Sequence, residues 1–282
     1  MTIRPDLLLA HEFGEVRQSY EERDAILYAL GLGLGADPTD ADDLAFLDET
    51  RLQALPTFAV TLASPGMWIR DPRFGVAFKQ LVHAAQDVVF GDKLPPAATI
   101  VGTARVAALG DRGAGRGAEL VVEREVRGAA DGRLHATIRQ TLLLRGDGGF
   151  GGAPPVRAPS LIPDRRPDLV SEVRVSPRAA LIYRLSGDRN PLHIDPDFAR
   201  SAGFERPILH GLASYGMAGV AVARALGRTP DAVTRLACRF SGVVYPGDKL
   251  SFAIWRERAG ARFAAHVGDR KVLDQGLLEV TQ

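Results

Sequence analysis

The sequence predicts an α+β protein made of two halves of similar size, each containing several strands. Seven segments rich in Val, Ile, Leu and Thr show partial alternation of apolar and polar residues, which is typical of strands with one buried face. They lie near 99–109, 117–127, 134–145, 235–244, 248–257, 261–268 and 271–281. The stretch from Gly146 to Pro167 separates the first three from the last four, and its ten Gly and Pro residues leave no periodic apolar pattern. We therefore expect an N-terminal unit over 1–145, a linker over 146–168 and a C-terminal unit over 169–282.

The composition predicts a soluble globular protein. Of the 282 residues, 46% are hydrophobic and 24% are charged, and both fractions are ordinary. The net charge of +1 argues against a dedicated nucleic-acid binder. No run of about 18 apolar residues occurs, so a membrane-spanning helix is not expected. Cys238 is the single cysteine, which excludes an intramolecular disulfide, and its place in an expected strand predicts a small buried side chain.

No targeting signal is expected from the two ends of the sequence. The N-terminus lacks a basic segment followed by an apolar core, so a secretory signal is not expected. The last residues, Val280 to Gln282, differ from a Ser-Lys-Leu type of peroxisomal signal. We therefore expect a cytoplasmic location, with neither a membrane nor a nucleic acid as a partner.

The first clear helix is expected over 19–31. Ser19 and Glu22 fit a capping box at its start, and Gly31 suits its end. The glycines from Gly31 to Gly35 resemble a phosphate-binding loop. They follow a helix rather than a strand, however, which favours a helix exit, the turn by which the chain leaves the helix. The Gly-rich segment 110–117 is followed by an expected strand, so it predicts a hairpin loop rather than a dinucleotide site.

Turn-forming residues dominate a loop in the second half of the chain. Ser176 suits the start of a short helix over 176–187, and this loop follows it. Asp188 and His193 lie five residues apart on the loop, and Pro191 stiffens the path between them. A carboxylate and an imidazole on a rigid loop can converge on one water molecule, as acid–base chemistry requires. A lone Asp or His on a loop is more often a solvated side chain, so the neighbouring sequence has to support the catalytic interpretation.

Small residues dominate the apolar run from Gly211 to Leu226. Their number predicts a helix with a sheet packed closely around it, and simple packing is the ordinary explanation of such a helix. Gly211 is expected near its N-terminus, where free N–H groups can bind an oxyanion. The four strands expected after this helix complete the pattern, because a helix wrapped by antiparallel strands is the hot dog fold.

Two motifs carry a resemblance to a known family. The segment Ser186-Gly-Asp-Arg-Asn-Pro-Leu-His193 resembles the signature of hydratase 2, the R-specific enoyl-CoA hydratases of the MaoC-like dehydratase family. Ile208-Leu-His-Gly-Leu212 resembles the second block of that family. The resemblance covers nearly the whole chain and implies a double hot dog fold, in which two repeats are fused and only the second keeps the catalytic motif.

The activity implied by this resemblance is the reversible syn hydration of a trans-2-enoyl-CoA to a (3R)-3-hydroxyacyl-CoA. Asp188 and His193 would hold one water and share the proton transfers, and which of them is the acid and which the base stays open. Asn190 would orient the water or the loop, and the N–H of Gly211 would bind the thioester oxygen. The acyl-CoA substrate is the expected partner and a homodimer the expected assembly, with no metal or other cofactor.

The resemblance also implies residues outside the motif. Glu49 matches a functionally important Glu that precedes the family's Pro-Thr-Phe segment; the alternative is a solvated loop acid. His83 and Ala84 match a His-Gly pair in the stretch that touches the acyl-CoA, although His83 also suits a plain strand histidine. Arg112 matches a basic position near the coenzyme A phosphates, and Phe240 matches a position lining the acyl pocket; a solvated arginine and a core aromatic are the alternatives. The first half would hold the acyl chain while the second does the chemistry.

Two other classes of function are compatible with this fold. An acyl-CoA thioesterase would need its carboxylate near the long helix, whereas Asp188 is expected on a turn. A non-catalytic acyl-CoA-binding or scaffold protein would need neither Asp188 nor His193. A metal site built from His193 and Asp195 is a further idea, but no third ligand is evident.

Overall fold

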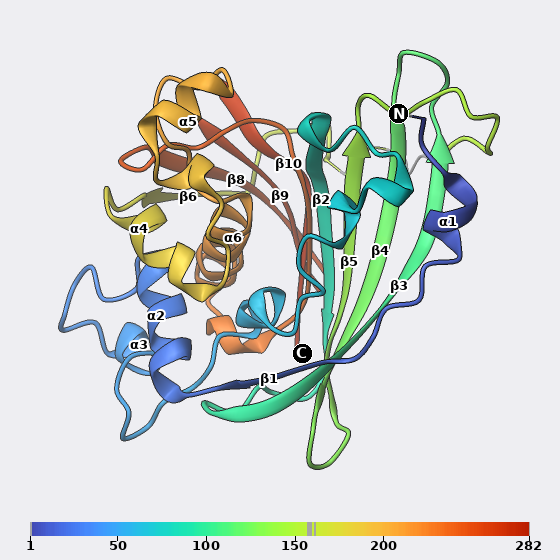
Figure 1. The fold of residues 1–282 in the computed structure, drawn as a ribbon. Coiled ribbons are helices and arrows are strands. Elements are labelled where there is room, and N and C mark those ends of the chain that lie inside the picture. Colours follow the sequence, from blue (N-terminus) through green and yellow to red (C-terminus); the bar gives the residue numbers. More distant parts are fainter. Residues whose placement is uncertain (1, 157–159, 161, 282) are drawn as a thin grey trace.

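One antiparallel sheet of ten strands forms the framework of the molecule (Figure 1). The computed structural model describes residues 2–156, 160 and 162–281. The strands are β1 (Val16–Tyr20), β2 (Leu81–Phe90), β3 (Ala98–Asp111), β4 (Ala118–Gly128), β5 (Leu134–Leu144), β6 (Leu169–Arg174), β7 (Val233–Phe240), β8 (Lys249–Glu257), β9 (Gly260–Val267) and β10 (Arg270–Val280). Their order across the sheet is β1-β3-β4-β5-β2-β7-β10-β9-β8-β6.

The two halves of this sheet repeat one topology. Read from its outer edge, the first half runs β1-β3-β4-β5-β2 and the second runs β6-β8-β9-β10-β7, so each strand has a counterpart five strands later in the sequence. The halves join where β2 pairs with β7, from Ala85 opposite Arg239 to Val89 opposite Arg235. This arrangement confirms the predicted double hot dog fold. All seven expected strands are present, while β1, β2 and β6 were not expected as strands.

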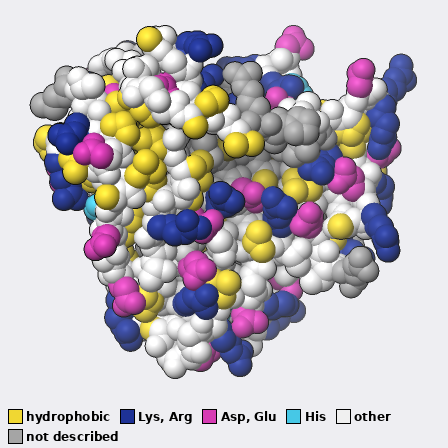
Figure 2. All heavy atoms as spheres, turned by 90° about the vertical axis from the view of Figure 1, so that its right-hand side faces the viewer, with side chains coloured by type: hydrophobic (Ala, Val, Ile, Leu, Met, Phe, Trp, Pro, Cys, Tyr) yellow, Lys and Arg dark blue, Asp and Glu magenta, His cyan; other side chains and the backbone are white. Residues whose placement is uncertain are grey.

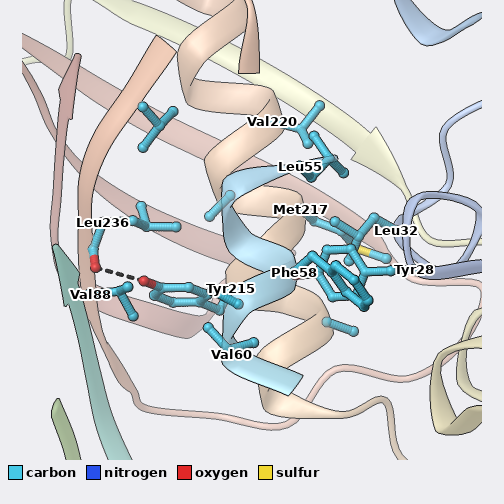
Figure 3. Packing of buried hydrophobic residues seen from close by; sticks show 14 of the residues in the cluster. Tyr28, Leu32, Leu55, Phe58, Val60, Val88, Tyr215, Met217, Val220 and Leu236 are labelled. Carbon is cyan, nitrogen blue, oxygen red and sulfur yellow. Dashed lines mark hydrogen bonds between the residues drawn. The ribbon is translucent and has the colours of Figure 1, made fainter. Parts of the chain in front are cut away.

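The helix α6 (Gly211–Ala225) fills the second repeat, and no helix of that length fills the first within the described residues. Eleven of its 15 residues are buried. A Cβ at Gly219 would lie 3.2 Å from Leu236 of β7, which fits the predicted close packing of a sheet around this helix. A Cβ at Gly216 would lie 2.8 Å from Leu32 and Tyr28 of α2 (Glu22–Leu32), so the small residues also allow close packing of a second helix. The first repeat places the 3-10 helix η1 (Pro56–Thr61) beside α6 instead, and Figure 3 shows Phe58 of η1 near Met217 of α6.

Shorter helices complete the covering layers. The α-helices are α1 (Pro5–Leu9), α2 (Glu22–Leu32), α3 (Ala41–Leu44), α4 (Ala179–Tyr183) and α5 (Pro196–Ser201). The remaining 3-10 helices are η2 (Trp68–Arg70), η3 (Pro72–Phe74), η4 (Phe78–Gln80), η5 (Arg184–Ser186), η6 (Pro191–His193) and η7 (Pro230–Ala232). In Figure 1, α2 and α4 lie with α6 on the side of the second repeat, while α1 lies against the first.

The first helix differs from the prediction at both ends. Ser19 belongs to β1, where its hydroxyl contacts that of Thr99, and the capping box is formed by Glu21 and Asp24. The expected box of Ser19 and Glu22 is therefore wrong, because pairing with β3 extends the chain up to Tyr20. The helix also ends slightly later than expected, with Gly33 as its C-cap at φ 98°.

The helix expected over 176–187 is shorter than predicted. It starts at Ala179, continues as the 3-10 turn η5 and stops at Gly187 with φ 115°. The Ser176 hydroxyl accepts the N–H of Arg178 and so lies in the turn before the helix. Helix α4 packs on α2 at Gly31, where an added Cβ would lie only 3.2 Å from the Cα of Tyr183. The C-terminal end of α2 therefore supports the start of the motif loop.

Three smaller predictions are confirmed. Within segment 110–117, residues 112–117 form the hairpin loop between β3 and β4, with Gly113 and Gly117 at positive φ. The glycines after α2 form a helix exit, in which the N–H of Gly35 donates to the Asp43 carboxylate at 2.6 Å. Cys238 is buried at 3% exposure in β7, as a small core side chain.

The glycine-rich segment before residue 157 is fixed to the first repeat. The carboxylate of Asp111 accepts the N–H groups of Gly113, Gly149 and Gly151, and these bonds lower the pKa of Asp111. Near the other end of the expected linker, the indole N–H of Trp255 donates to the carbonyl of Arg165 at 2.8 Å. Residues 157–159 and 161 of the expected linker lie outside the described residues.

The outer face of β3, β4 and β5 carries a row of charged side chains. Arg105, Glu123 and Arg139 lie opposite one another on β3, β4 and β5, and both arginines pair with the glutamate. On the face that Figure 2 views, which is the α1 side of the molecule, basic and acidic side chains are interspersed with hydrophobic ones. Within the described part of the chain, the helices are all too short or too polar to cross a membrane.

The second half alone is expected to be insoluble or inactive. A fragment 169–282 would expose the edge of β7, which pairs with β2 in the full chain, and the face of α6 that packs on α2 and η1. Unpaired edges and exposed apolar faces favour aggregation. Soluble yield, circular dichroism and turnover of the fragment would test this expectation, with co-expression of residues 1–168 as the control. A soluble and fully active fragment would contradict the dependence of the two repeats on each other.

Candidate active site

Local turns position the motif loop after η5. The N–H of Asn190 donates to Oδ1 of Asp188 at 3.2 Å, and Oδ1 of Asn190 accepts the N–H of Leu192 at 3.1 Å. Asn190 therefore caps η6, the short helix that ends at His193. Of the two roles expected for Asn190, orienting the water or the loop, these contacts belong to the loop.

His193 presents one free ring nitrogen. Its Nδ1–H donates to the carbonyl of Ile208 at 2.9 Å, so Nε2 carries the lone pair. Nε2 lies 3.9 Å from Oδ2 of Asp188, whose side chain is 53% exposed, whereas that of His193 is 9% exposed. Burial lowers the pKa of His193 below the usual 6.5, against smaller opposite effects of the hydrogen bond to Ile208 and then of Asp188. His193 is therefore neutral near pH 7 and can accept a proton.

His210 completes the cluster and was not among the expected catalytic residues. Its ring stacks on that of His193 with centroids 3.7 Å apart, and its Nε2–H donates to the backbone carbonyl of Asp188 at 3.1 Å. Burial, and then repulsion by His193, lower the pKa of His210 to about 4. Its Nδ1 is buried without a hydrogen-bond partner among the described residues. The sequence feature that could have identified His210 was its position beside Gly211 in the second motif.

The gap between these side chains suits a water molecule. Ligand atoms of Asp188, His193 and His210 all lie within 4.8 Å of one another. The 3.9 Å between Nε2 of His193 and Oδ2 of Asp188 is too long for a direct hydrogen bond but is bridged readily by water. For comparison, two ligand atoms of a tetrahedral zinc, each about 2.1 Å from the metal, lie roughly 3.4 Å from each other, which is closer than Nε2 of His193 and Oδ2 of Asp188.

Asp195 does not join this cluster. Its carboxylate caps α5 by accepting the N–H groups of Asp197 and Phe198. The metal site considered from His193 and Asp195 therefore has no support from the positions of these side chains.

Gly211 begins α6 directly after His210. The first intrahelical bonds to the carbonyl of His210 come from Ala213 and Ser214, so the N–H groups of Gly211 and Leu212 have no acceptor among the described residues. An added Cβ at Gly211 would lie 3.3 Å from the ring of Phe240. The helix start thus offers free donors beside the Asp188–His193 loop, and glycine leaves room to approach them.

His83, Ala84 and Phe240 lie where the two halves of the sheet separate. The pairing of β2 with β7 ends at Ala85, and Ala84 is the extra residue of a bulge between β2 and β5. The His83 and Phe240 rings lie 4.8 Å apart. Burial lowers the pKa of His83 to about 4, against smaller opposite effects of hydrogen bonds with Ala85 and Gln86 and, last, of the Asp188 charge. Through Phe240, which lies beside Gly211, this part of the sheet adjoins the cluster of Asp188, His193 and His210.

Arg112 and Glu49 lie farther away. Arg112 follows β3 and pairs with Glu119, three strands from β2, which corresponds to roughly 14 Å. Glu49 is exposed and lines a surface hollow with Glu21 and Glu22 at the N-terminal end of α2. The opposite end of α2 packs on α4, so about 14 Å of helix separates Glu49 from the motif loop.

Comparison with known proteins identifies the family. Residues 159–275 match the MaoC like domain, and residues 18–146 match the MFE-2 hydratase 2 N-terminal domain. A 3-hydroxyacyl-thioester dehydratase Y of Mycobacterium tuberculosis is 41% identical, and the alignment covers 92% of each chain. The peroxisomal enoyl-CoA hydratase 2 of Arabidopsis thaliana is 38% identical, with 94% of this chain and 91% of the relative covered. The chain belongs to the MaoC-like dehydratase family.

The solved structure of a MaoC-like dehydratase from Phytophthora capsici agrees with this assignment. Its TM-score is 0.83 at 30% identity, with 99% of both chains covered. Like its relatives, this MaoC-like dehydratase is an enzyme of the hydro-lyase class. Asp188 lies beside the start of α6, so its position alone does not separate the hydratase from the thioesterase. The relatives named above are a dehydratase and a hydratase, which favours the hydratase.

Proposed function

We propose that this MaoC-like dehydratase catalyses the reversible hydration of a trans-2-enoyl-CoA to a (3R)-3-hydroxyacyl-CoA. The observation that carries the proposal is the water-sized gap between Asp188 and His193, next to the free N–H groups at the start of α6. A nucleophilic water and an oxyanion donor are the two elements that conjugate addition to a thioester needs. Hydration involves no net oxidation or reduction, so we propose that it uses no cofactor beyond the coenzyme A of the substrate.

The proton transfers follow from the two acceptor atoms. Nε2 of neutral His193 and Oδ2 of Asp188 both accept hydrogens of the water, so a water lone pair can point toward C3. As the oxygen adds to C3, one proton passes to this pair, and the electrons of the double bond move onto the thioester oxygen. A proton then returns from the same side to C2, which makes the addition syn. Either side chain can take the first proton.

The start of α6 stabilises the charge that develops on the thioester oxygen. The free N–H of Gly211 points out of the helix end, where the positive end of the helix dipole also lies. An oxyanion donor of this kind contributes a few kcal/mol to the transition state, typically about 2.7–4 kcal/mol. The ring of Phe240 limits the space beside this donor and would keep the acyl group against it.

The other expected contacts extend from this centre. His83 and Phe240 at the split of the sheet would touch the acyl group near the thioester, and the first repeat would hold the rest of the acyl chain. Arg112, at three strand spacings from β2, lies at a distance suited to the coenzyme A phosphates. Glu49 stays a prediction for which the described contacts offer no mechanism.

Product chirality tests the proposal. Both acceptor atoms belong to one loop and can hold the water on one side of the substrate, so water should add to one face of crotonyl-CoA and of longer enoyl-CoAs. The expected product is the (3R)-hydroxyacyl-CoA, measured by chiral chromatography after thioester hydrolysis. A predominance of the 3S product would overturn the proposal, whatever the rate. Release of free coenzyme A without hydration would favour the thioesterase, and tight binding without turnover would favour the binding protein.

The pH dependence of turnover is expected to show an acid limb below pH 6.5. Burial lowers the pKa of His193, so its neutral form persists through neutral pH and is lost as the pH falls through the lowered pKa. If the neutral ring is required, kcat/KM should be level above neutrality and fall about tenfold per pH unit below that pKa. The pH profile for crotonyl-CoA would show this, with His193→Gln as the control that lacks the limb. A rise in activity toward lower pH would mean that the protonated ring is needed.

The homodimer and the cytoplasmic location are also proposals, based on the family resemblance and the sequence. Sedimentation analysis of the purified protein and cell fractionation would test them. No partner other than the acyl-CoA is required by the mechanism.

A further inference from the structure

A buried arginine stands in the first repeat without an ionic partner among the described residues. Arg124 on β4 is 9% exposed, and it points to the inner face of the sheet with its buried neighbours Val122 and Val126. Its Nη2 donates to the carbonyl of Val60 at 2.9 Å, and its Nε has no hydrogen-bond partner in the described part of the chain. Burial is the one resolved influence on its pKa, which falls to about 10, so the side chain stays charged at neutral pH.

The position of Arg124 separates two apolar clusters. Val126 and Ile138 belong to the large core around α6, whereas Val122 and Leu142 belong to a second cluster under α1 and η3. Between them the inner face carries polar side chains on three adjacent strands. These are Gln86 of β2, Gln140 of β5 and Arg124 of β4, which we call the polar seam.

The polar seam begins at the candidate active site. Gln86 lies directly opposite Gln140, and the Gln140 amide reaches Nδ1 of His83 at 3.5 Å. His83 in turn contacts Phe240, which borders Gly211. Counting four residues along β5 and two strand spacings, Arg124 lies roughly 17 Å from His83. The seam therefore leads from the thioester position across the first repeat.

A buried charge without a counter-ion is costly. Even one unpaired ionic group in the interior costs several kcal/mol, about 3–5 kcal/mol where a partner has been removed. The single carbonyl of Val60 satisfies one of the five N–H donors of Arg124. Capping the end of η1 would need only a neutral donor, so it does not account for a guanidinium here. The unsatisfied charge is explained if an anion occupies this place when substrate is bound.

We propose that Arg124 binds a carboxylate at the far end of the acyl chain, so that the preferred substrates are enoyl-CoAs with a terminal carboxyl group. The inference rests on the proposed hydratase function and narrows its substrate class. A carboxylate matches the fork of a guanidinium and can use Nε together with an Nη group. Gln86 and Gln140 would line the path of the chain. The carbonyl that Arg124 contacts belongs to η1, a 3-10 helix of six residues.

The wild-type enzyme gives the first test. Rates of hydration and affinities of the saturated analogues would be compared for three acyl-CoAs of equal medium chain length, which end in a carboxylate, its methyl ester or a methyl group. The carboxylate should exceed the ester in kcat/KM and in affinity by about tenfold or more, the size of one charge-assisted contact of about 1.5–3 kcal/mol. Equal or weaker use of the carboxylate would overturn the inference.

Variants separate recognition from folding. In Arg124→Met, the ratio of kcat/KM for the carboxylate to that for the methyl-ended substrate should fall by at least about tenfold. Arg124→Lys should keep part of this ratio, because it keeps the charge without the fork. Arg127→Met is the matched control, since Arg127 lies on the same strand, three residues on, with its side chain paired to Glu125 on the outer face. A merely structural role would lower both rates together and leave the ratio unchanged, which contradicts the proposal.

Crotonyl-CoA separates the test of the proposed hydratase function from the test of the role of Arg124. This substrate is too short to reach Arg124, so its hydration by the wild-type enzyme tests the proposed function alone. Hydration of crotonyl-CoA without a preference for the carboxylate refutes only the role of Arg124. Failure to hydrate any of the substrates refutes the proposed function, and the affinities of the saturated analogues still report on the anion site.

Discussion

Replacing Asp188 by Asn or His193 by Gln is expected to lower kcat for enoyl-CoA hydration by roughly 10²–10⁴-fold each. Asn keeps the size of the Asp188 side chain and an oxygen for the turn at Asn190, while it removes the negative charge that faces the water. Gln can keep the bond to the Ile208 carbonyl but offers no basic nitrogen. The measurement is the initial rate of hydration of crotonyl-CoA, followed by loss of the enoyl absorbance.

The double variant tests whether the pair acts as a unit. If one water is held by both groups, removing the second acceptor should add little, so the double variant should be only slightly slower than either single one. Affinity for a saturated acyl-CoA should barely change in any of the three, because neither side chain is assigned to hold the nucleotide. Asp195→Asn is the matched control, since Asp195 lies on the same loop but caps α5.

Two different results would contradict the proposed roles of Asp188 and His193. Near-normal turnover of Asp188→Asn would defeat the mechanism, because no other described carboxylate joins the cluster with His193 and His210. A loss of affinity equal to the loss of rate would indicate that the loop contributes to binding alone. That result would favour the acyl-CoA-binding protein over the enzyme.

Local sequence signals predicted the parts of the fold that local chemistry determines. The small residues of α6, the alternation in seven strands and the turn formers around Asp188 each act within a short stretch of chain. The strands that were missed depend on distant partners. β2 carries Gln86 on its buried face, which breaks the apolar alternation, and it is stabilised by pairing with β5 and β7. The five-residue edge strand β1 displaced the start of the first helix in the same way.

The candidate site shows the same division. Asp188 and His193 could be predicted because one loop holds both, and Gly211 because it begins a recognisable helix. The stacking of His210 on His193 joins two segments 17 residues apart and requires the folded chain. The polar seam depends on the pairing of β2 with β5, although β3 and β4 lie between these two strands in the sequence. Neither feature has a local pattern from which it could have been predicted.

A bulky residue at Gly211 is expected to damage both turnover and acyl-CoA binding. In Gly211→Val the first Cβ would lie 3.3 Å from the Phe240 ring, and the further methyl groups would cover the free N–H at the start of α6. Loss of an oxyanion donor lowers kcat by roughly 10²–10³-fold, and crowding of the thioester oxygen should weaken binding of a saturated acyl-CoA as well. Gly14→Val is the control, because an added Cβ at the exposed Gly14 meets nothing within 4 Å.

A second substitution identifies the cause of that loss. If Val at position 211 acts through a steric clash with Phe240, then Phe240→Leu in the same chain should restore much of the activity. If it acts by covering the donor, the added change should restore little, and this is the outcome we expect. The thermal midpoint of each variant shows whether folding is affected, because Gly211 has no positive φ and its backbone accepts a side chain. Normal kcat in a folded Gly211→Val variant would exclude this helix end as the oxyanion site, and the thioester oxygen would then have to be stabilised elsewhere.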